Sequence, residues 1–414
     1  MPRPRGASTP FAGTAVLLGA LLLAACTAPG GSPSGTLPDA GTPGTRTPGT
    51  PSPSAPTPEP SGSPSPAPSS PSPTLQDVLD SMSLEEKVGQ LLVVGAPVLD
   101  GESGDATRTA LRDHHAGGIF LHGRSEAGAD AVRDLVDGYV ADAPGDTELL
   151  VATDQEGGFV QVLQGPGFSE IPRATVQADW SRDRLEREAT TWASELADVG
   201  VNLNLAPVMD LVPPDNQTAN EPIGYYSRNY GNTADQVVES ATAFSAGMQA
   251  SGVEPVIKHF PGLGYVTQNT DTSGNVVDDT VTADSASVDV FAQGIDAGAR
   301  FVMVSNAVYA KIDPDVPAPF SEKVVDGLLR DDLGFDGVII TDDVSAAAAV
   351  QYLSPAERAV DAIDAGVDVV LASADPAVVP AMADAIAERA RDDAEFAQRV
   401  DESASRVLAA KADL

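Results

Sequence analysis

One stretch of the sequence joins an apolar run to a cation, an imidazole and a carboxylate: Pro255-Val256-Ile257-Lys258-His259-Phe260-Pro261-Gly262-Leu263-Gly264-Tyr265-Val266-Thr267-Gln268-Asn269-Thr270-Asp271. Taken alone, it has a simple structural interpretation, in which Lys258 extends to solvent, His259 makes a structural hydrogen bond and Pro261-Gly262 forms a turn. Short motifs of this kind also occur by chance. The stretch indicates polar groups at the mouth of a barrel if other strands of the chain end in the same way.

The globular part of the chain contains eight short apolar runs, most of them rich in β-branched residues. Their ranges are 89–95, 117–122, 149–154, 201–208, 254–260, 300–305, 337–342 and 367–373. Such runs are typical of strands buried on both faces, and segments of helical periodicity lie between them, as at 183–199 and 356–365. Eight alternations predict an α/β fold with a single (β/α)8 TIM-type barrel. A doubly wound open sheet is the alternative, but no G-x-G-x-x-G pattern follows the first run.

Polar residues stand where most of these runs end. They are His122, Asp154, Asp210, Lys258 with His259, Ser305 with Asn306, and Asp342 with Asp343. In a parallel barrel the carboxyl ends of the strands form the functional face. A single Asp at such a place is often the N-cap of the next helix, and this interpretation stays open for Asp210 and Asp343. So many polar strand ends together predict one site at the barrel mouth.

The N-terminus has the pattern of a secretion signal. Arg3 and Arg5 precede an apolar segment at 15–23, which is too short for a convincing membrane span, and the segment runs into Leu23-Ala24-Ala25-Cys26. This ending resembles a bacterial lipobox and predicts that 1–25 is a signal peptide and that Cys26 carries the lipid. The alternative is an ordinary signal peptide with an incidental cysteine. Because Cys26 is the only cysteine, no disulfide can form within the chain.

Residues 26–73 consist almost entirely of Pro, Ser, Thr, Gly and Ala. Such a segment cannot bury enough apolar surface to offset its ordering entropy, so it is expected to be an extended, disordered linker. The globular domain is predicted at 74–414. A lipid anchor on the outer face of the cell membrane, followed by a linker, places the domain in the cell wall. Glycan or peptide of the wall is therefore the first substrate class to consider.

The acidic composition of the chain excludes some classes of binding partner. The chain has 414 residues, 60 acidic and 24 basic, and a formal net charge of -36. This argues against nucleic acid or an anionic membrane surface as a partner. A metal site is also disfavoured, because the chain has four histidines, of which His114-His115 is expected in a connecting loop and not in an H-E-x-x-H helix. No cofactor and no protein partner is indicated.

Carboxylates, a lysine and a histidine at one barrel mouth suit hydrolysis of a neutral, hydroxyl-rich ligand. Carboxylates accept hydrogen bonds from sugar hydroxyls, lysine and histidine donate to them, and one carboxylate can attack an anomeric carbon. At this point the sequence resembles glycoside hydrolase family 3, in particular its single-domain bacterial β-N-acetylglucosaminidases. The similarity covers nearly all of 75–374, and the motifs that carry it are 82–90, 154–158, 205–210, 258–262 and 333–343.

The resemblance implies a function and a set of roles. Asp342 would be the nucleophile, and Asp154, Lys258 and His259 would hold the hydroxyls of the nonreducing sugar. Arg228, in 227–231, looks like the sugar-binding arginine of the family. The implied activity is that of a retaining exo-β-glycosidase, a β-N-acetylglucosaminidase that acts on peptidoglycan-derived glycans. The chain ends soon after Asp342, so the second domain that supplies the acid in two-domain members is expected to be missing, and the barrel itself should supply the acid.

The sequence departs from the family pattern at the position of this acid. Single-domain members carry D-S-H after the K-H-F-P-G motif, whereas an ungapped alignment puts Asn269, Thr270 and Asp271 there. The usual aspartate–histidine dyad therefore cannot form. Three further positions differ from the residues that the family usually carries: Leu263 replaces a histidine, Phe159 an arginine, and Asn306 a common histidine.

Asp271 is the best sequence candidate for the general acid and base, since it occupies the vacated position. Its pKa would have to be raised by apolar surroundings or by Asp342. Alternatively Asp271 is a turn residue, and Asp343, Glu156 or the pair Asp278-Asp279 supplies the acid. If no acid exists, the protein is a lipid-anchored glycan-binding protein on the same barrel, or phosphate replaces water and it is a phosphorylase.

Overall fold

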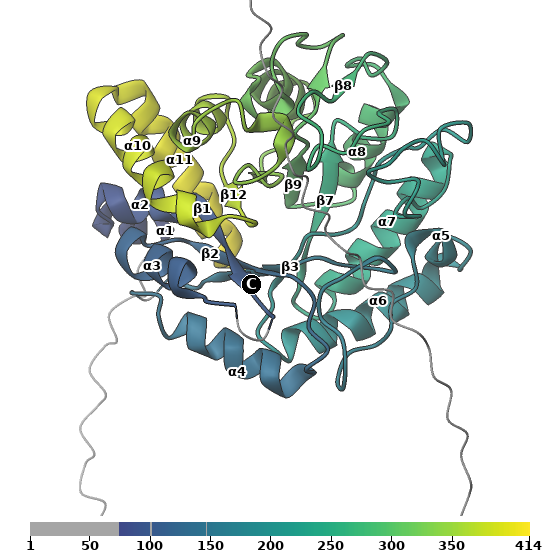
Figure 1. The fold of residues 1–414 in the computed structure, drawn as a ribbon, viewed down its shortest axis with the longest axis horizontal. Coiled ribbons are helices and arrows are strands. Elements are labelled where there is room, and N and C mark those ends of the chain that lie inside the picture. Colours follow the sequence, from purple (N-terminus) through teal and green to yellow (C-terminus); the bar gives the residue numbers. More distant parts are fainter. Residues whose placement is uncertain (1–73, 100–101, 146) are drawn as a thin grey trace, which may run out of the picture. The chain divides into compact units, whose positions relative to one another are not determined.

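The barrel is an eight-stranded parallel sheet (Figure 1). The computed structural model describes residues 74–99, 102–145 and 147–414. In pairing order the strands are β11 (Val338–Thr341), β9 (Phe301–Val304), β7 (Glu254–Phe260), β6 (Leu203–Asn204), β3 (Leu150–Thr153), β2 (Gly118–His122), β1 (Leu92–Pro97) and β12 (Val370–Ala372). A bridge between Ile340 and Val369 joins the two edges of the sheet. The predicted (β/α)8 barrel is thus confirmed.

Helices surround the sheet. They are α1 (Leu75–Ser81), α2 (Leu84–Gln90), α3 (Asp105–His114), α4 (Ala129–Val140), α5 (Ala174–Gln177), α6 (Arg182–Ala197), α7 (Ala234–Gln249), α8 (Ala286–Asp296), the π-helical η2 (Lys323–Asp332), α9 (Pro355–Asp364), α10 (Val379–Asp392) and α11 (Ala394–Lys411), with short 3₁₀ turns η1 (Ala318–Phe320), η3 (Ala348–Val350) and η4 (Pro376–Val378). Helices α1, α2 and α9 begin with capping boxes, which satisfy the free N–H groups of their first turns.

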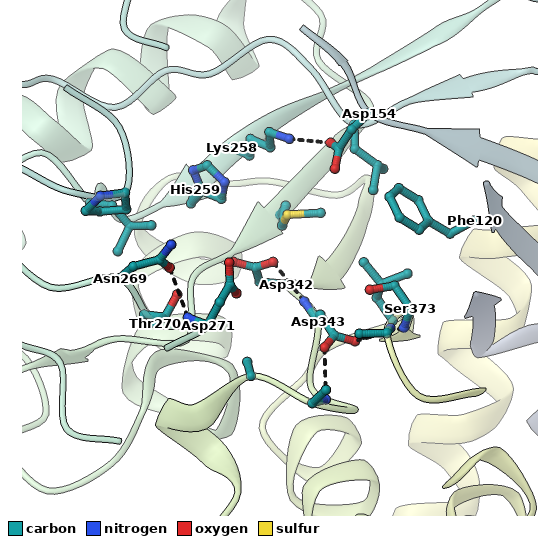
Figure 2. Close-up of a pocket in the computed structure, with 18 of the residues that line it drawn as sticks. Phe120, Asp154, Lys258, His259, Asn269, Thr270, Asp271, Asp342, Asp343 and Ser373 are labelled. Atoms are coloured by element: carbon teal, nitrogen blue, oxygen red, sulfur yellow. Dashed lines mark hydrogen bonds and ion pairs between the residues drawn. The ribbon is translucent and has the colours of Figure 1, made fainter. Parts of the chain in front are cut away.

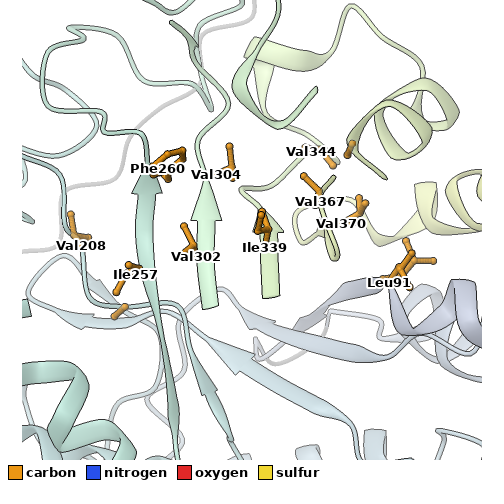
Figure 3. Close-up of a cluster of buried hydrophobic side chains, with 14 of the residues drawn as sticks. Leu91, Val208, Ile257, Phe260, Val302, Val304, Ile339, Val344, Val367 and Val370 are labelled. Carbon is orange, nitrogen blue, oxygen red and sulfur yellow. The ribbon is translucent and has the colours of Figure 1, made fainter. Parts of the chain in front are cut away.

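Two apolar layers hold the barrel together. The outer layer lies between strands and helices and includes Ile257, Val302 and Ile339 (Figure 3). Inside the barrel, alternate strand residues such as Val256 and Met303 form a second cluster, as the two-residue strand period requires. Val407 and Ala410 of α11 belong to this inner cluster. Helix α11 therefore packs against the inner cluster from the end at which the strands begin, and the opposite end remains for a site.

One strand boundary and one loop assignment predicted from the sequence were wrong. The first strand was expected at 89–95, but Gly89 and Gln90 complete helix α2, and the strand begins at Leu92. The capping box at Ser83 and Glu86 starts that helix, and the apolar run continues without a break from helix into strand. His114 was expected in a loop but is the last residue of α3.

Several predictions fall on residues outside the described part of the chain. They concern the signal peptide at 1–25, the linker at 26–73 and lipidation of Cys26. Among the described residues, no helix combines the length and apolarity that a membrane crossing requires.

Candidate active site

A pocket of about 370 Å3 opens at the carboxyl ends of the barrel strands (Figure 2). Its floor consists of the inner-cluster residues Phe120, Leu205, Met303 and Leu371. All six candidate site residues of the barrel line it: Asp154, Arg228, Lys258, His259, Asp271 and Asp342. The structure thus brings together side chains that are spread over almost two hundred positions of the sequence.

Lys258 forms the buried centre of the polar wall. Its Nζ lies 2.6 Å from Asp154 Oδ1 and 2.7 Å from Glu156 Oε1. Burial alone would lower the pKa of Lys258, but the two carboxylates outweigh it and raise the pKa above the usual value. Lys258 therefore stays charged, and Asp154, which is about a quarter exposed, presents a free edge to the pocket.

Glu156 pairs with a second cation. Arg228 Nε and Nη2 donate to its two carboxylate oxygens at 2.9 and 2.7 Å, which is the two-point geometry that guanidinium favours. Burial would raise the pKa of Glu156, but Arg228 and Lys258 lower it to about 2. A carboxyl that stays ionised at such a pH cannot donate a proton, so Glu156 is excluded as the general acid. The sequence pointed to Glu156 only through its place in the 154–158 motif. Its partner Arg228 lies 72 positions away and could not be identified from that motif.

We expect Glu156→Gln to lower the free energy of unfolding by about 3–5 kcal/mol at pH 7, because it leaves Lys258 and Arg228 buried without their shared anion. The folded pKa of about 2 lies below the unfolded value near 4.5. The ion-pair contribution is therefore present above about pH 4.5 and is lost as the pH falls towards 2. Denaturant unfolding from pH 7 to 3 should show this loss in the wild type and not in Glu156→Gln.

As a control for this prediction, Asp130→Asn breaks an exposed ion pair and should change the free energy of unfolding little. Equal stability of Glu156→Gln and wild type would contradict the assigned role.

His259 is oriented by Asp210. Its Nδ1 lies 2.7 Å from Asp210 Oδ2, and the other oxygen, Oδ1, accepts the backbone N–H of Leu263 at 2.6 Å. Asp210 is fully buried and does not line the pocket. It therefore holds both the imidazole and the start of the following loop, which is a different role from the helix N-cap that the sequence left open.

Asp342 and Asp271 lie side by side in the pocket (Figure 2). Asp342 follows β11, and its Oδ1 accepts the N–H of Asp343 at 2.8 Å. Burial and the neighbouring Asp271 carboxylate raise the pKa of Asp342 to about 6, against the opposing effect of His259. Desolvation by the pocket walls also raises the pKa of Asp271, although its side chain is open to solvent in the pocket mouth. Two neighbouring carboxyls with raised pKa values can share one proton near neutral pH.

The loop that carries Asp271 is fixed by hydrogen bonds around that residue. Asp271 donates its backbone N–H to Asn269 Oδ1 at 2.9 Å, so it is indeed part of an Asn turn. Its carbonyl and that of Thr270 accept the N–H groups of Ala348 and Ala349, at 3.1 and 3.0 Å. The turn interpretation and the pocket interpretation of Asp271 are therefore compatible, because the turn itself delivers the side chain to the pocket.

The other candidate acids are engaged elsewhere or lie outside the pocket. Asp343 accepts the N–H groups of Ala346 and Ser373 at 2.9 and 2.8 Å, so its carboxylate fixes two loops. Asp278 and Asp279 do not line the pocket. Asp271 is the remaining candidate of the four alternatives.

The other polar strand ends, and the residues that differ from the family pattern, lie around the site without a direct catalytic role. Asn306 donates to the carbonyl of Asp343 at 2.7 Å, and Ser305 bonds the hydroxyl of Tyr309. Leu263 is buried and lines the pocket, Phe159 is exposed, and His122 lies outside the lining. Within the described residues, no group of three or more His, Cys, Asp or Glu side chains is arranged to hold a metal ion.

Comparisons with known proteins agree with this geometry. Residues 83–410 match the model of the glycosyl hydrolase family 3 N-terminal domain. A β-N-acetylhexosaminidase structure from Beutenbergia cavernae DSM 12333 is 56% identical, with a TM-score of 0.79, over 80% of this chain and 99% of that chain. A family 3 β-N-acetylglucosaminidase structure from Paenibacillus sp. str. FPU-7 is 29% identical, with a TM-score of 0.71, over 80% and 63% of the two chains. A β-hexosaminidase from Stenotrophomonas maltophilia (strain R551-3) is 33% identical over 64% of this chain and 78% of its own length.

Proposed function

This chain belongs to glycoside hydrolase family 3, and from that premise we propose that it is a retaining exo-β-glycosidase that removes N-acetylglucosamine from the nonreducing ends of glycans. Hydrolysis of an O-glycosyl bond follows from the family and from the β-hexosaminidase relatives. The observation that carries the finer proposal is the pair Asp271 and Asp342, which share one pocket with a wall of hydrogen-bonding groups. The names of the relatives support N-acetylglucosamine as the sugar.

In the proposed reaction Asp342 attacks the anomeric carbon, and the bond from that carbon to the leaving oxygen breaks. Asp271 gives its proton to the leaving oxygen, so that the departing sugar leaves as an alcohol and a glycosyl ester of Asp342 remains. In the second step Asp271, now a carboxylate, takes a proton from water. The water oxygen attacks the anomeric carbon and releases the Asp342 carboxylate. Two displacements leave the sugar with its original β configuration.

The polar wall would hold the nonreducing sugar. Asp154 accepts hydrogen bonds from its hydroxyls, while Arg228, Lys258 and His259 donate to them. Because Glu156 keeps Lys258 and Arg228 charged and Asp210 fixes His259, the wall is already arranged before substrate enters. The sugar ring thereby meets Asp342 in one orientation, and this positioning is the main contribution of the wall to the rate.

The test of this function is the release of nitrophenol from a set of nitrophenyl β-glycosides: N-acetylglucosaminide, glucoside and xyloside. We expect release from the N-acetylglucosaminide, with the β anomer of the free sugar as the first product in a proton NMR time course. First release of the α anomer would contradict the retaining mechanism. No release from any of the three would favour the glycan-binding alternative. Formation of sugar phosphate in phosphate buffer would favour a phosphorylase.

The proposed location is the outer face of the cell membrane, with the barrel reaching peptidoglycan-derived glycans of the wall. It rests on the lipobox at Cys26 and on the composition of the following segment. We expect wild-type protein to incorporate a palmitate analogue in a bacterial host and to be processed in a globomycin-sensitive manner, and Cys26→Ser to lose both properties. Wild-type protein that is soluble and unlabelled would contradict the anchor.

A further inference from the structure

Three aromatic side chains form an exposed cluster near the pocket. Phe159, Tyr225 and Tyr226 are 55%, 63% and 36% exposed. The ring centroids of Phe159 and Tyr226 are 5.6 Å apart, those of Tyr225 and Tyr226 are 5.0 Å apart, and both pairs meet edge to face. Large apolar rings that contact one another and remain open to solvent often mark a binding surface. These three residues are called the aromatic platform below.

The platform is tied to the pocket wall through one ion pair. Phe159 lies in the turn between β4 (Gln155–Gly157) and β5 (Val160–Gln161), three positions after Glu156. Tyr225 and Tyr226 lie shortly before Arg228, which pairs with Glu156 and lines the pocket. The same pair therefore holds together the two segments that carry the rings.

The chain reverses between the rings and the pocket arginine. Ser227 has a φ of 59°, in the left-handed region that side chains other than Gly, Asn and Asp seldom adopt. This turn lets Arg228 face the pocket while Tyr225 stays outside at the surface. Pro222, from the same segment, also lines the pocket. The platform thus lies outside the pocket lining, on the two segments that the Glu156–Arg228 pair holds together.

The pocket has one open end. Its floor is the inner cluster of the barrel, against which α11 packs from the opposite end. An exo-acting site of this shape takes the terminal sugar into the pocket, so that any further sugar must pass over the rim. Sugar rings present flat C–H faces, which pack against aromatic rings.

One arginine contacts Phe159, and a second lies beside the neighbouring Gly158. Arg124 donates a hydrogen bond to the carbonyl of Phe159, and the backbone of Arg173 packs against Gly158. Both side chains are exposed, and in the part of the chain that the structure describes neither forms an ion pair, although acidic residues greatly outnumber basic ones. An exposed guanidinium group in this segment can donate hydrogen bonds to the oxygens of a sugar.

We infer that the aromatic platform is a subsite for the sugar on the leaving-group side of the scissile bond. This inference rests on the proposed function and deepens it, since it gives the protein a preference for oligosaccharides over short substrates. Phe159 stands where the family usually carries an arginine, so this ring of the platform departs from the family pattern. Its ligand is a pyranose ring joined to the one that the pocket holds.

The experiment compares two substrates that place the same sugar in the pocket and differ in the leaving group. N,N′,N″-triacetylchitotriose extends over the rim, whereas the β-fluoride of N-acetylglucosamine has a leaving group of one atom and cannot reach it. The readout is the ratio of kcat/KM for the two substrates, which does not change if a variant merely lowers the fraction of folded enzyme. For Phe159→Ala, Tyr225→Ala and Tyr226→Ala we expect this ratio to fall by about 3- to 10-fold each.

Three controls separate stacking from other effects. Tyr225→Phe and Tyr226→Phe retain the rings and should retain most of the ratio. Val140→Ala removes an exposed apolar side chain at the last residue of α4, away from the pocket lining, and should leave the ratio unchanged. A ratio that is unchanged in all three alanine variants would overturn the subsite. Cleavage of neither substrate by the wild type would instead overturn the proposed function.

Discussion

Asp342→Asn should lower kcat/KM for nitrophenyl N-acetylglucosaminide by about 10⁴-fold or more. The amide cannot form the glycosyl ester, so the route through two displacements is closed and only the positioning effect of the pocket remains. Nitrophenolate leaves without help from an acid, so the assay reports on the nucleophile almost alone. The measurement is steady-state nitrophenol release by the purified protein.

Two controls make this result specific. Burial raises the pKa of Asp342 to about 6, above its ordinary value of 3.8, so the carboxyl costs stability as the pH rises between these values and the full cost is present at pH 7. The asparagine variant should therefore melt no earlier than the wild type at pH 7. Asp279→Asn removes an exposed carboxylate outside the pocket and should keep full activity. A 5-fluoro N-acetylglucosaminyl fluoride should label the wild type on the peptide that contains Asp342. Labelling of another carboxylate, or a loss of activity below about 10-fold, would contradict the assignment.

The fold could be predicted because most strands are visible in the sequence as short apolar runs. The runs that became β9 and β11 are apolar at almost every position, since both faces of a barrel strand are covered. The boundary between α2 and β1 could not be read in this way. The apolar run crosses it, and the helix ends within that run with Gly89-Gln90 in its last turn, so burial alone does not separate the two elements.

The site was predictable as a set of strand ends and not as a network. Lys258, His259 and Asp342 were visible as polar residues after apolar runs. The role of Glu156 was not, because it depends on Arg228, which comes from a different loop. Asp271 was a candidate from its place in the sequence, but the contacts that fix its loop were hidden, since they are backbone bonds from Ala348 and Ala349, much later in the chain.

Phe159 shows a further limit of sequence comparison. In the sequence, Phe159 was notable only because it replaces the arginine that the family usually carries at this position. In the structure it is an exposed ring in contact with Tyr226. A substitution that removes one kind of contact can thus introduce another, and only the packing of the neighbouring loop reveals it.

Asp271→Ala should lower kcat/KM for N,N′-diacetylchitobiose by about 10²- to 10⁴-fold, because a sugar alkoxide is a poor leaving group without a proton donor. For dinitrophenyl N-acetylglucosaminide, whose leaving group needs no proton, the loss in kcat/KM should be far smaller. The second step still lacks its base, so the glycosyl ester should accumulate and kcat should fall. Azide, a small nucleophile that needs no base, should restore kcat and yield the β-glycosyl azide.

The pH dependence of the same enzyme tests whether Asp271 acts beside Asp342. The carboxylate of Asp271 raises the pKa of Asp342, so Asp271→Asn should lower that pKa. Since kcat/KM for the dinitrophenyl substrate requires ionised Asp342, its acidic limb should move to lower pH in the variant, while Asp279→Asn should leave the limb where it is. An unmoved limb together with equal losses on both substrates would show that Asp271 is a turn residue only. A shifted limb with azide rescue would assign both steps of proton transfer to this one carboxyl, which a turn and two distant backbone bonds hold in the place of the missing dyad.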